Sequence, residues 1–94
     1  MQPPSEKPMN FQGEYEIIPE NTRGSIMRYM EHGIQPGSFL TAVLSNDLYN
    51  ATGRADRGNL AALPAIVRWF ANKCPGLYGV ENMREHIASK RKES

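Results

Sequence analysis

Two aspartates, three asparagines and two arginines gather in the middle of the chain. The set consists of Asn46, Asp47, Asn50, Arg54, Asp56, Arg57 and Asn59. Carboxylates and amides recognise polar ligand groups through hydrogen bonds, and the planar arginine side chain binds phosphate with paired N–H donors. The set therefore predicts a polar pocket for a small ligand, with arginine at its rim. The structural alternative is that Asp47 accepts hydrogen bonds from backbone N–H groups at the start of the helix that follows Asp56, or pairs with Arg54, while Asp56 and Asn59 are helix caps.

Two further features add to the predicted pocket. The run Pro36-Gly37-Ser38 opens a helix, and the free N–H groups of a helix start attract phosphate or carboxylate. A plain turn with Ser38 as cap is the alternative at that position. Tyr49 and Tyr78 are the aromatic residues that we expect to stack on a nucleotide base.

Catalytic and metal-binding motifs are missing from the sequence. It contains no glycine-rich loop followed by lysine, no nucleophile elbow and no paired cysteines. Cys74 is a single cysteine, and His32 and His86 are not spaced as a metal pair within one helix. We therefore expect a protein that is not an enzyme and needs no cofactor or metal. A small hydrolase that uses Asp47 and Asp56, with Mg²⁺, ranks as the third choice.

The apolar residues after Pro19 recur at helical spacing and predict an all-α fold. We expect a compact bundle of about four short helices, with an extended N-terminal arm. The helices run from Asn21 or Thr22 to about Glu31, from Ser38 to Gly53, from about Asn59 to Pro75, and from Val80 to Ala88. Gly33 is placed to end the first of them.

Two residues interrupt the apolar stripes of these helices. Asp47 falls within the stripe at positions 40, 43, 44, 47, 48 and 51, where a carboxylate is costly unless it is hydrogen-bonded or paired. Pro64 lies within the stripe of Leu60, Leu63, Ile66, Val67 and Phe70, which passes through it without a change of phase. We therefore favour a mild kink at Pro64, and a helix start after Leu63 is the alternative.

Length and composition allow one small domain with an arm and a tail. The 94 residues are 39% hydrophobic and 22% charged, which is typical of a globular protein. Residues 1–19 are predicted to be a proline-rich extended or flexible arm, with a weak strand signal at Tyr15 and Ile17. Residues 20–89 form the helical domain, and 90–94 a charged, fraying tail. The net charge of +1 argues against a nucleic acid or a membrane as partner.

Two aromatic residues outside the polar set are candidates for an interface. We expect Tyr29 and Trp69 to contact another subunit or a partner protein, because tyrosine and tryptophan are enriched at protein interfaces. Packing of Trp69 on the N-terminal arm is the alternative for that residue. A core as thin as this one also gains from the burial that self-association provides, so a homo-oligomer is expected.

The segment PGSFLTAVLSNDL at residues 36–48 resembles a family of small proteins encoded by tailed phages and prophages. The likeness extends over about residues 19–80 and includes Thr22, Tyr29 and Gly33 before the segment, and Asp56 and Trp69 after it. The arm lies outside it. Members often carry Trp-Gly-Ser before the last helix, where this chain has Leu77-Tyr78-Gly79.

The resemblance implies a phage accessory protein that acts in the cytoplasm of a bacterial host. Small proteins of this kind act mostly by binding, and some counter bacterial defence. The leading expectation is that this one sequesters a nucleotide-type immune signal, such as a cyclic nucleotide or an ADP-ribose derivative, as a homo-oligomer. The alternative is an inhibitor or adaptor that binds a host protein directly.

Overall fold

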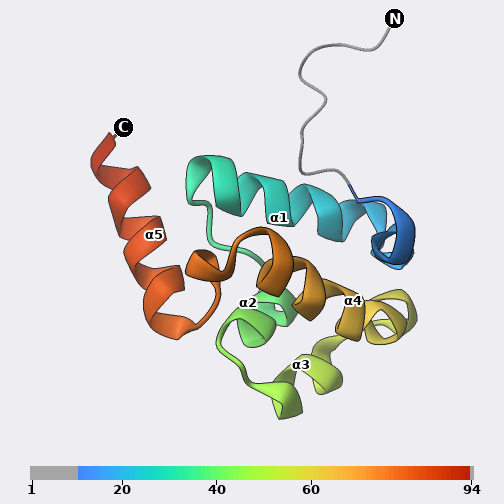
Figure 1. Ribbon diagram of the computed structural model, residues 1–94. Helices are drawn as coiled ribbons and strands as arrows, with labels where there is room; N and C mark the ends of the chain where they lie inside the picture. Colours follow the sequence, from blue (N-terminus) through green and yellow to red (C-terminus); the bar gives the residue numbers. More distant parts are fainter. Residues whose placement is uncertain (1–10, 94) are drawn as a thin grey trace, which may run out of the picture.

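Five α-helices and two short 3₁₀ helices make up the part of the chain that this computed structural model describes, residues 11–93 (Figure 1). In chain order they are η1 (Gly13–Ile17), α1 (Glu20–His32), α2 (Ser38–Leu44), α3 (Leu48–Arg54), α4 (Arg57–Lys73), η2 (Pro75–Leu77) and α5 (Val80–Glu93). No strand occurs within residues 11–93. The predicted all-α class is therefore confirmed, with one α-helix more than the four expected.

The centre of the core lies on α4. Trp69 and Phe70 are fully buried there and meet edge to face, with ring centroids 5.2 Å apart. Tyr29 of α1 is also fully buried, 6.5 Å from Phe70 between ring centroids. Phe11 stacks on the outer side of Trp69 at 4.9 Å. Trp69 lies off the apolar stripe predicted for this helix, and the segment before α1 explains why it is nevertheless buried.

Residues 11–19, which belong to the predicted arm, pack on the helical body. Tyr15 and Ile18 are buried, and the Tyr15 hydroxyl accepts a hydrogen bond from the Asn72 side chain of α4 at 2.9 Å. The weak strand signal at Tyr15 and Ile17 is wrong, since both residues lie in η1. The Arg23 guanidinium holds the segment in place by donating to the carbonyls of Ile18 and Glu16. The rest of the predicted arm, residues 1–10, lies outside the described residues.

The single helix predicted from Ser38 to Gly53 is in fact two helices. Asn46 adopts a left-handed conformation with φ of 61°, and the N–H groups of Asn46 and Asp47 donate to the carbonyls of Val43 and Ala42. This is the hydrogen-bond pattern of a Schellman helix stop, and asparagine tolerates the left-handed conformation that it requires. Asp47 then begins α3 as its N-cap. The carboxylate is half-exposed rather than directed into the core, so that prediction is corrected.

Helix α4 begins at Arg57, and Asp56 is its N-cap. It continues through Pro64, whose side chain is exposed, so the favoured interpretation of a helix with an internal proline is confirmed. The predicted stripe is only partly buried. Ile66 and Phe70 are covered, but Leu60 is 48% exposed. One edge of this helix is therefore left uncovered by the rest of residues 11–93.

Helix α5 packs against α1 through Met83 and Ile87 and runs on through most of the predicted fraying tail. The two helices lie close together at Gly33, which ends α1 with φ of 66°, as predicted. A side chain at Gly33 would lie 2.5 Å from the Cβ of Lys90. Glycine is therefore required there both by the backbone conformation and by the space available.

Candidate functional site

Both aspartates of the predicted polar set are engaged as helix caps. Asp47 accepts hydrogen bonds from the backbone N–H of Asn50 at 3.2 Å and from its side-chain amide at 2.8 Å. These hydrogen bonds hold the pKa of Asp47 below its ordinary value. Asp56 accepts from the backbone N–H of Asn59 at 2.8 Å. The structural alternative is therefore correct for Asp56, whereas Asp47 caps α3 instead of the helix that follows Asp56.

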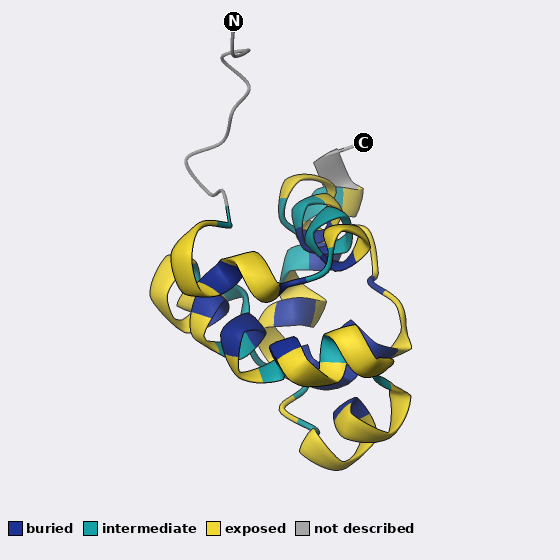
Figure 2. Ribbon diagram, turned by 90° about the vertical axis from the view of Figure 1, so that its right-hand side faces the viewer, coloured by how far each residue is buried: buried dark blue, intermediate teal, exposed yellow. Residues whose placement is uncertain are grey.

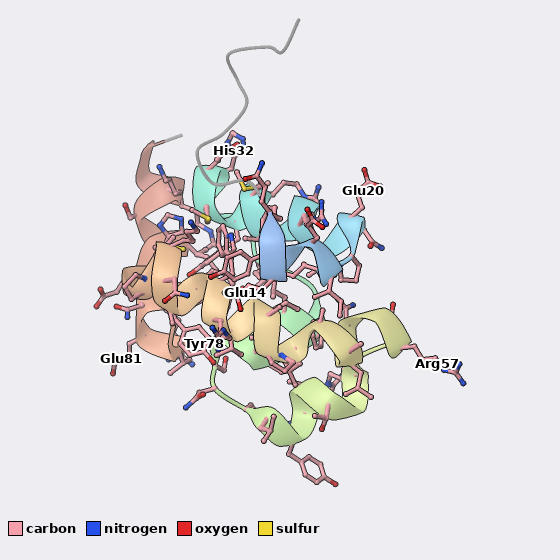
Figure 3. The ribbon with its side chains drawn as sticks, turned by 45° about the vertical axis from the view of Figure 1, so that its right-hand side comes forward. Glu14, Glu20, His32, Arg57, Tyr78 and Glu81 are labelled. Carbon is pink, nitrogen blue, oxygen red and sulfur yellow. The ribbon has the colours of Figure 1, made fainter. Side chains whose placement is uncertain are left out.

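The two arginines of the set do not converge on one pocket. Figure 3 shows Arg57 pointing away from the body at the start of α4. Arg54 is exposed at the end of α3. Its charge contributes to the lowered pKa of Asp47, but within residues 11–93 it forms no contact ion pair, so the predicted Asp47–Arg54 pair is not formed. Arg54 does line an open hollow of about 330 Å³ together with Ser38, Asp47 and Asn50.

The two predicted stacking tyrosines also lie apart. The Tyr78 hydroxyl donates to Oδ1 of Asn46 at 3.3 Å, and burial raises the pKa of Tyr78. Both residues line a mostly apolar pocket of about 170 Å³ between α3 and α4. Tyr49 is 85% exposed on α3 and lines none of the pockets described here. The structure thus brings Tyr78 to Asn46 and leaves Tyr49 in solvent.

A more polar pocket, of about 310 Å³, lies between α1, the start of α2 and the start of α4. Three of the predicted site residues line this pocket: Gly37, Ser38 and Asn59. It therefore combines the helix start at residues 36–38 with one member of the polar set. Phe39 and Leu40 supply its apolar part. Its remaining wall comes from α1 and consists of Asn21, Thr22, Ser25 and Arg28, none of which was predicted from the sequence to be a site residue.

These α1 residues share one side of the helix because they recur at intervals of three and four. Thr22 forms a 2.6 Å hydrogen bond with Oδ1 of Asn59 and so ties α1 to α4 at the edge of the pocket. The Arg28 guanidinium lies back along the helix and donates to the Ser25 hydroxyl at 3.3 Å. The recurrence of polar residues at positions 21, 25 and 28 is the signal that sequence reasoning missed.

The charge of this pocket favours an anion. Among the described residues that line it, Arg28 is the only ionisable one, and none of them is a carboxylate that would compete. The hydroxyl and amide groups of Ser25, Ser38 and Asn21 can donate or accept hydrogen bonds. Since Oδ1 of Asn59 is engaged with Thr22, its NH₂ group is the part left to donate to a ligand. The lining therefore offers one fixed positive charge surrounded by neutral hydrogen-bonding groups.

The two predicted interface residues are not at the surface. Tyr29 and Trp69 are both 0% exposed. The Tyr29 hydroxyl donates to the carbonyl of Leu77 at 2.7 Å, and burial raises the pKa of Tyr29 to about 12. Neither side chain can contact a partner while the domain is folded, contrary to the prediction, because η1 and η2 cover them.

The remaining reactive side chains have structural positions. His86 is half-buried, and its Nε2 atom lies 2.8 Å from the carbonyl oxygen of Tyr29 and 3.0 Å from that of Met30. It thereby satisfies carbonyls in the last turn of α1. Burial raises the pKa of Cys74 to about 11, so its thiol is un-ionised at neutral pH. The described residues contain no cluster of three or more potential metal ligands.

Comparison with protein-family models, with curated proteins and with solved structures finds no match to this chain. Within residues 11–93, none of the helices has the length and apolar character to cross a membrane. The function is therefore inferred from the chemistry of the pockets themselves.

Proposed function

We propose that the protein is a non-enzymatic binding protein that sequesters a small anionic ligand of the nucleotide type in the pocket lined by Arg28. One observation carries this proposal: of the lining residues between 11 and 93, the only charged one is an arginine, and hydroxyl and amide groups surround it. Arginine binds phosphate oxygens through charge-assisted hydrogen bonds. The neutral groups suit the hydroxyls of a ribose and the edge of a base.

The size of the pocket supports a ligand no larger than one nucleotide unit per chain. At about 310 Å³ it lies at the lower end of the range of roughly 300–1,000 Å³ for small-molecule sites. Cyclic dinucleotides and ADP-ribose derivatives contain two such units. A homo-oligomer that brings two pockets together would enclose a ligand of that kind, which is why self-association belongs to the proposal.

Sequestration is favoured over hydrolysis by the positions of the carboxylates. Asp47 and Asp56 are engaged with the backbone N–H groups that they cap, and neither lines the Arg28 pocket. The pocket therefore lacks a carboxylate or histidine that could act as general acid or base. A ligand held there would be released unchanged. In the phage setting that the resemblance implies, holding a signal in this way lowers its free concentration and counters the host's defence.

Isothermal titration calorimetry on the full chain tests the proposal. The probes are cyclic di- and trinucleotides, cyclic ADP-ribose isomers and adenosine monophosphate. We expect binding of at least one probe, and a loss of about tenfold or more in affinity for Arg28→Ala, because a hydrogen bond to a charged group contributes about 1.5–3 kcal/mol. Arg57→Ala is the matched control, since Arg57 lines no pocket described here and points into solvent. Mass spectrometry should recover the bound probe unaltered.

Three results would contradict the proposal. No heat with any probe would remove the evidence for a nucleotide-type ligand. Loss of binding in Arg57→Ala, with binding retained in Arg28→Ala, would place the site at the polar set predicted from the sequence. Conversion of a probe to a new product would show that the protein is an enzyme.

A further inference from the structure

Residues 11–18 lie against α4 as a strap at the surface of the molecule. Most of them are exposed, and Figure 2 shows the segment on the outside of the body. Tyr15 and Ile18 are the two buried residues of the strap. At its beginning, Phe11 stacks on Trp69 with ring centroids 4.9 Å apart. The strap therefore covers one side of the largest fully buried side chain of the core.

The polar contacts between the strap and α4 are partly or largely exposed. Glu14 forms an ion pair with Arg68 at 3.1 Å, and the two side chains are 47% and 63% exposed. Exposed ion pairs contribute little to stability. The Tyr15 hydroxyl accepts one hydrogen bond from the Asn72 side chain, and η1 has no side-chain cap. The stack of Phe11 on α4 is therefore one of the main contacts that keep the strap in place.

The indole N–H of Trp69 makes the closed strap less stable. This side chain is fully buried, yet its N–H has no hydrogen-bond acceptor among residues 11–93. A buried donor without an acceptor costs free energy, because it has lost its hydrogen bonds to water. Movement of Phe11 away from the ring would let water approach the indole. The unpartnered donor therefore favours local opening of the strap.

The strap is joined to the Arg28 pocket through the start of α1. Pro19, the residue after the strap, lies against the start of α4, where a Cβ atom at Gly58 would be 3.3 Å from its Cγ atom. Within the first turn of α1, Thr22 forms its hydrogen bond with Asn59, and both residues line the pocket. Two contacts that hold α1 against α4 therefore lie between the strap and the pocket.

Arg23 connects the strap to the same part of α1. Its guanidinium donates to the carbonyls of Ile18 at 2.8 Å and Glu16 at 2.7 Å, and it lies 5.6 Å from the centre of the Phe11 ring. A cation at this distance from an aromatic ring is attracted to it. Arg23 directly follows Thr22 in the sequence. A strap that is held by Arg23 therefore also holds the start of α1.

We propose that residues 11–18 open and close as a strap, and that the closed strap holds α1 in the position that the Arg28 pocket requires. The strap thereby regulates the affinity of the pocket. A chain with an open strap binds the ligand more weakly, and bound ligand favours the closed strap by the same factor. This inference rests on the proposed function for its ligand. The opening of the strap and its effect on α1 are properties of the free protein.

Two measurements on the ligand-free full chain test the opening. Acrylamide quenching of fluorescence reports the exposure of Trp69, the single tryptophan of the chain. Amide hydrogen exchange, followed by NMR, reports the start of α1 at the N–H of Arg23, which donates to the carbonyl of Pro19. Phe11→Ala should increase both, the exchange rate by about two- to tenfold, because an aromatic pair changes an equilibrium by that factor. Ile17→Ala, in the same strap but at a side chain that is 52% exposed, is the matched control and should change neither.

A second variant and a ligand titration complete the test. Arg23→Gln keeps both rings of the Phe11–Trp69 stack and removes the guanidinium, so it should also increase both readouts. Circular dichroism checks that each variant remains helical. With a nucleotide probe that the wild type binds, Phe11→Ala should raise the dissociation constant by about two- to tenfold, although Phe11 does not line the pocket. Saturation with the same probe should reduce the quenching of Trp69 in the wild type.

The outcomes separate the strap from the proposed ligand. Unchanged quenching and exchange in both variants would overturn the proposal. So would a strap that opens in Phe11→Ala while exchange at Arg23, or the affinity for a probe that the wild type binds, stays the same. If no probe binds the wild type, the proposed function fails, and exchange at Arg23 still decides whether the strap controls the part of the pocket wall that α1 forms.

Discussion

Replacing Tyr29 by phenylalanine removes one buried hydroxyl and leaves the packing of the ring unchanged. That hydroxyl donates to the carbonyl of Leu77 at 2.7 Å and joins α1 to η2, which are 48 residues apart in the sequence. The ring itself lies against Phe70 and His86, at 6.5 and 5.0 Å between ring centroids, and phenylalanine keeps that ring. The substitution therefore isolates a single hydrogen bond.

The expected loss in the free energy of unfolding arises because the Leu77 carbonyl is left without its hydrogen-bond donor. Removing one partner of a buried hydrogen bond costs about 1–3 kcal/mol, because the other partner is left unsatisfied. Leu77 is half-buried, so water partly replaces the hydroxyl and the lower part of that range applies, about 1–2 kcal/mol. For a domain of this size, such a loss lowers the melting temperature by about 4–16 °C.

Urea and thermal unfolding, followed by far-ultraviolet circular dichroism and by the fluorescence of Trp69, measure the effect. Tyr49→Phe is the control, because it deletes the same hydroxyl from a side chain that is 85% exposed. That control should be neutral within about 0.5 kcal/mol. The reasoning is refuted if Tyr29→Phe is as stable as the wild type, or if the two variants lose the same free energy.

Three further perturbations have defined outcomes. The free energy of unfolding should fall as the pH rises from about 9 to 12. Burial raises the pKa of Cys74 from 9.0 to about 11 and that of Tyr29 from 10.0 to about 12. The unfolded chain therefore loses these protons at a lower pH than the folded protein, which favours unfolding. Urea midpoints measured against pH should show this loss, and in Tyr29→Phe the part between pH 10 and 12 should shrink. Asp56→Ala should cost about 0.5–2 kcal/mol by leaving the N–H of Asn59 without its cap, whereas Asp56→Asn should be nearly neutral in the same urea titration. Pro64→Ala should raise the melting temperature, since an interior proline costs a helix about 3 kcal/mol relative to alanine and this one is exposed; a lower melting temperature would show that the core needs the proline.

Helix ends with a strong local signal were predictable from the sequence. Gly33 ends α1 in the left-handed conformation that favours glycine, and Asp56 caps α4. The break at Asn46 was not predicted, although asparagine followed by aspartate is a reasonable stop and start. The apolar stripe continues across the break because α2 and α3 both pack on the same core. Periodicity therefore argued for one helix, while the local hydrogen bonds of Asn46 and Asp47 favoured two.

The candidate site was less predictable than the helices. Polar residues that are close in sequence, such as Asp47 and Asn50, mostly satisfy one another at helix ends. The Arg28 pocket instead needs groups from positions 21–28, 37–40 and 59, and only the tertiary arrangement brings these together. Sequence reasoning found Gly37, Ser38 and Asn59 but assigned them to two different features. For the first helix, only the apolar residues were used to predict structure, and its polar residues were not considered as part of a site.

Helix α1 links the stability of the fold to the chemistry of the pocket, because it uses two sides at once. Ile26 and Tyr29 face the core, while Ser25 and Arg28 line the pocket, and Thr22 lies where the two sides meet. A ligand in the pocket contacts α1, α2 and α4 together and so favours the folded arrangement of all three. Binding to the folded state alone adds about 2.7 kcal/mol of stability when the ligand is at a hundred times its dissociation constant. A rise in melting temperature with a bound nucleotide, absent in Arg28→Ala, is therefore an expected consequence of where this pocket lies in the fold.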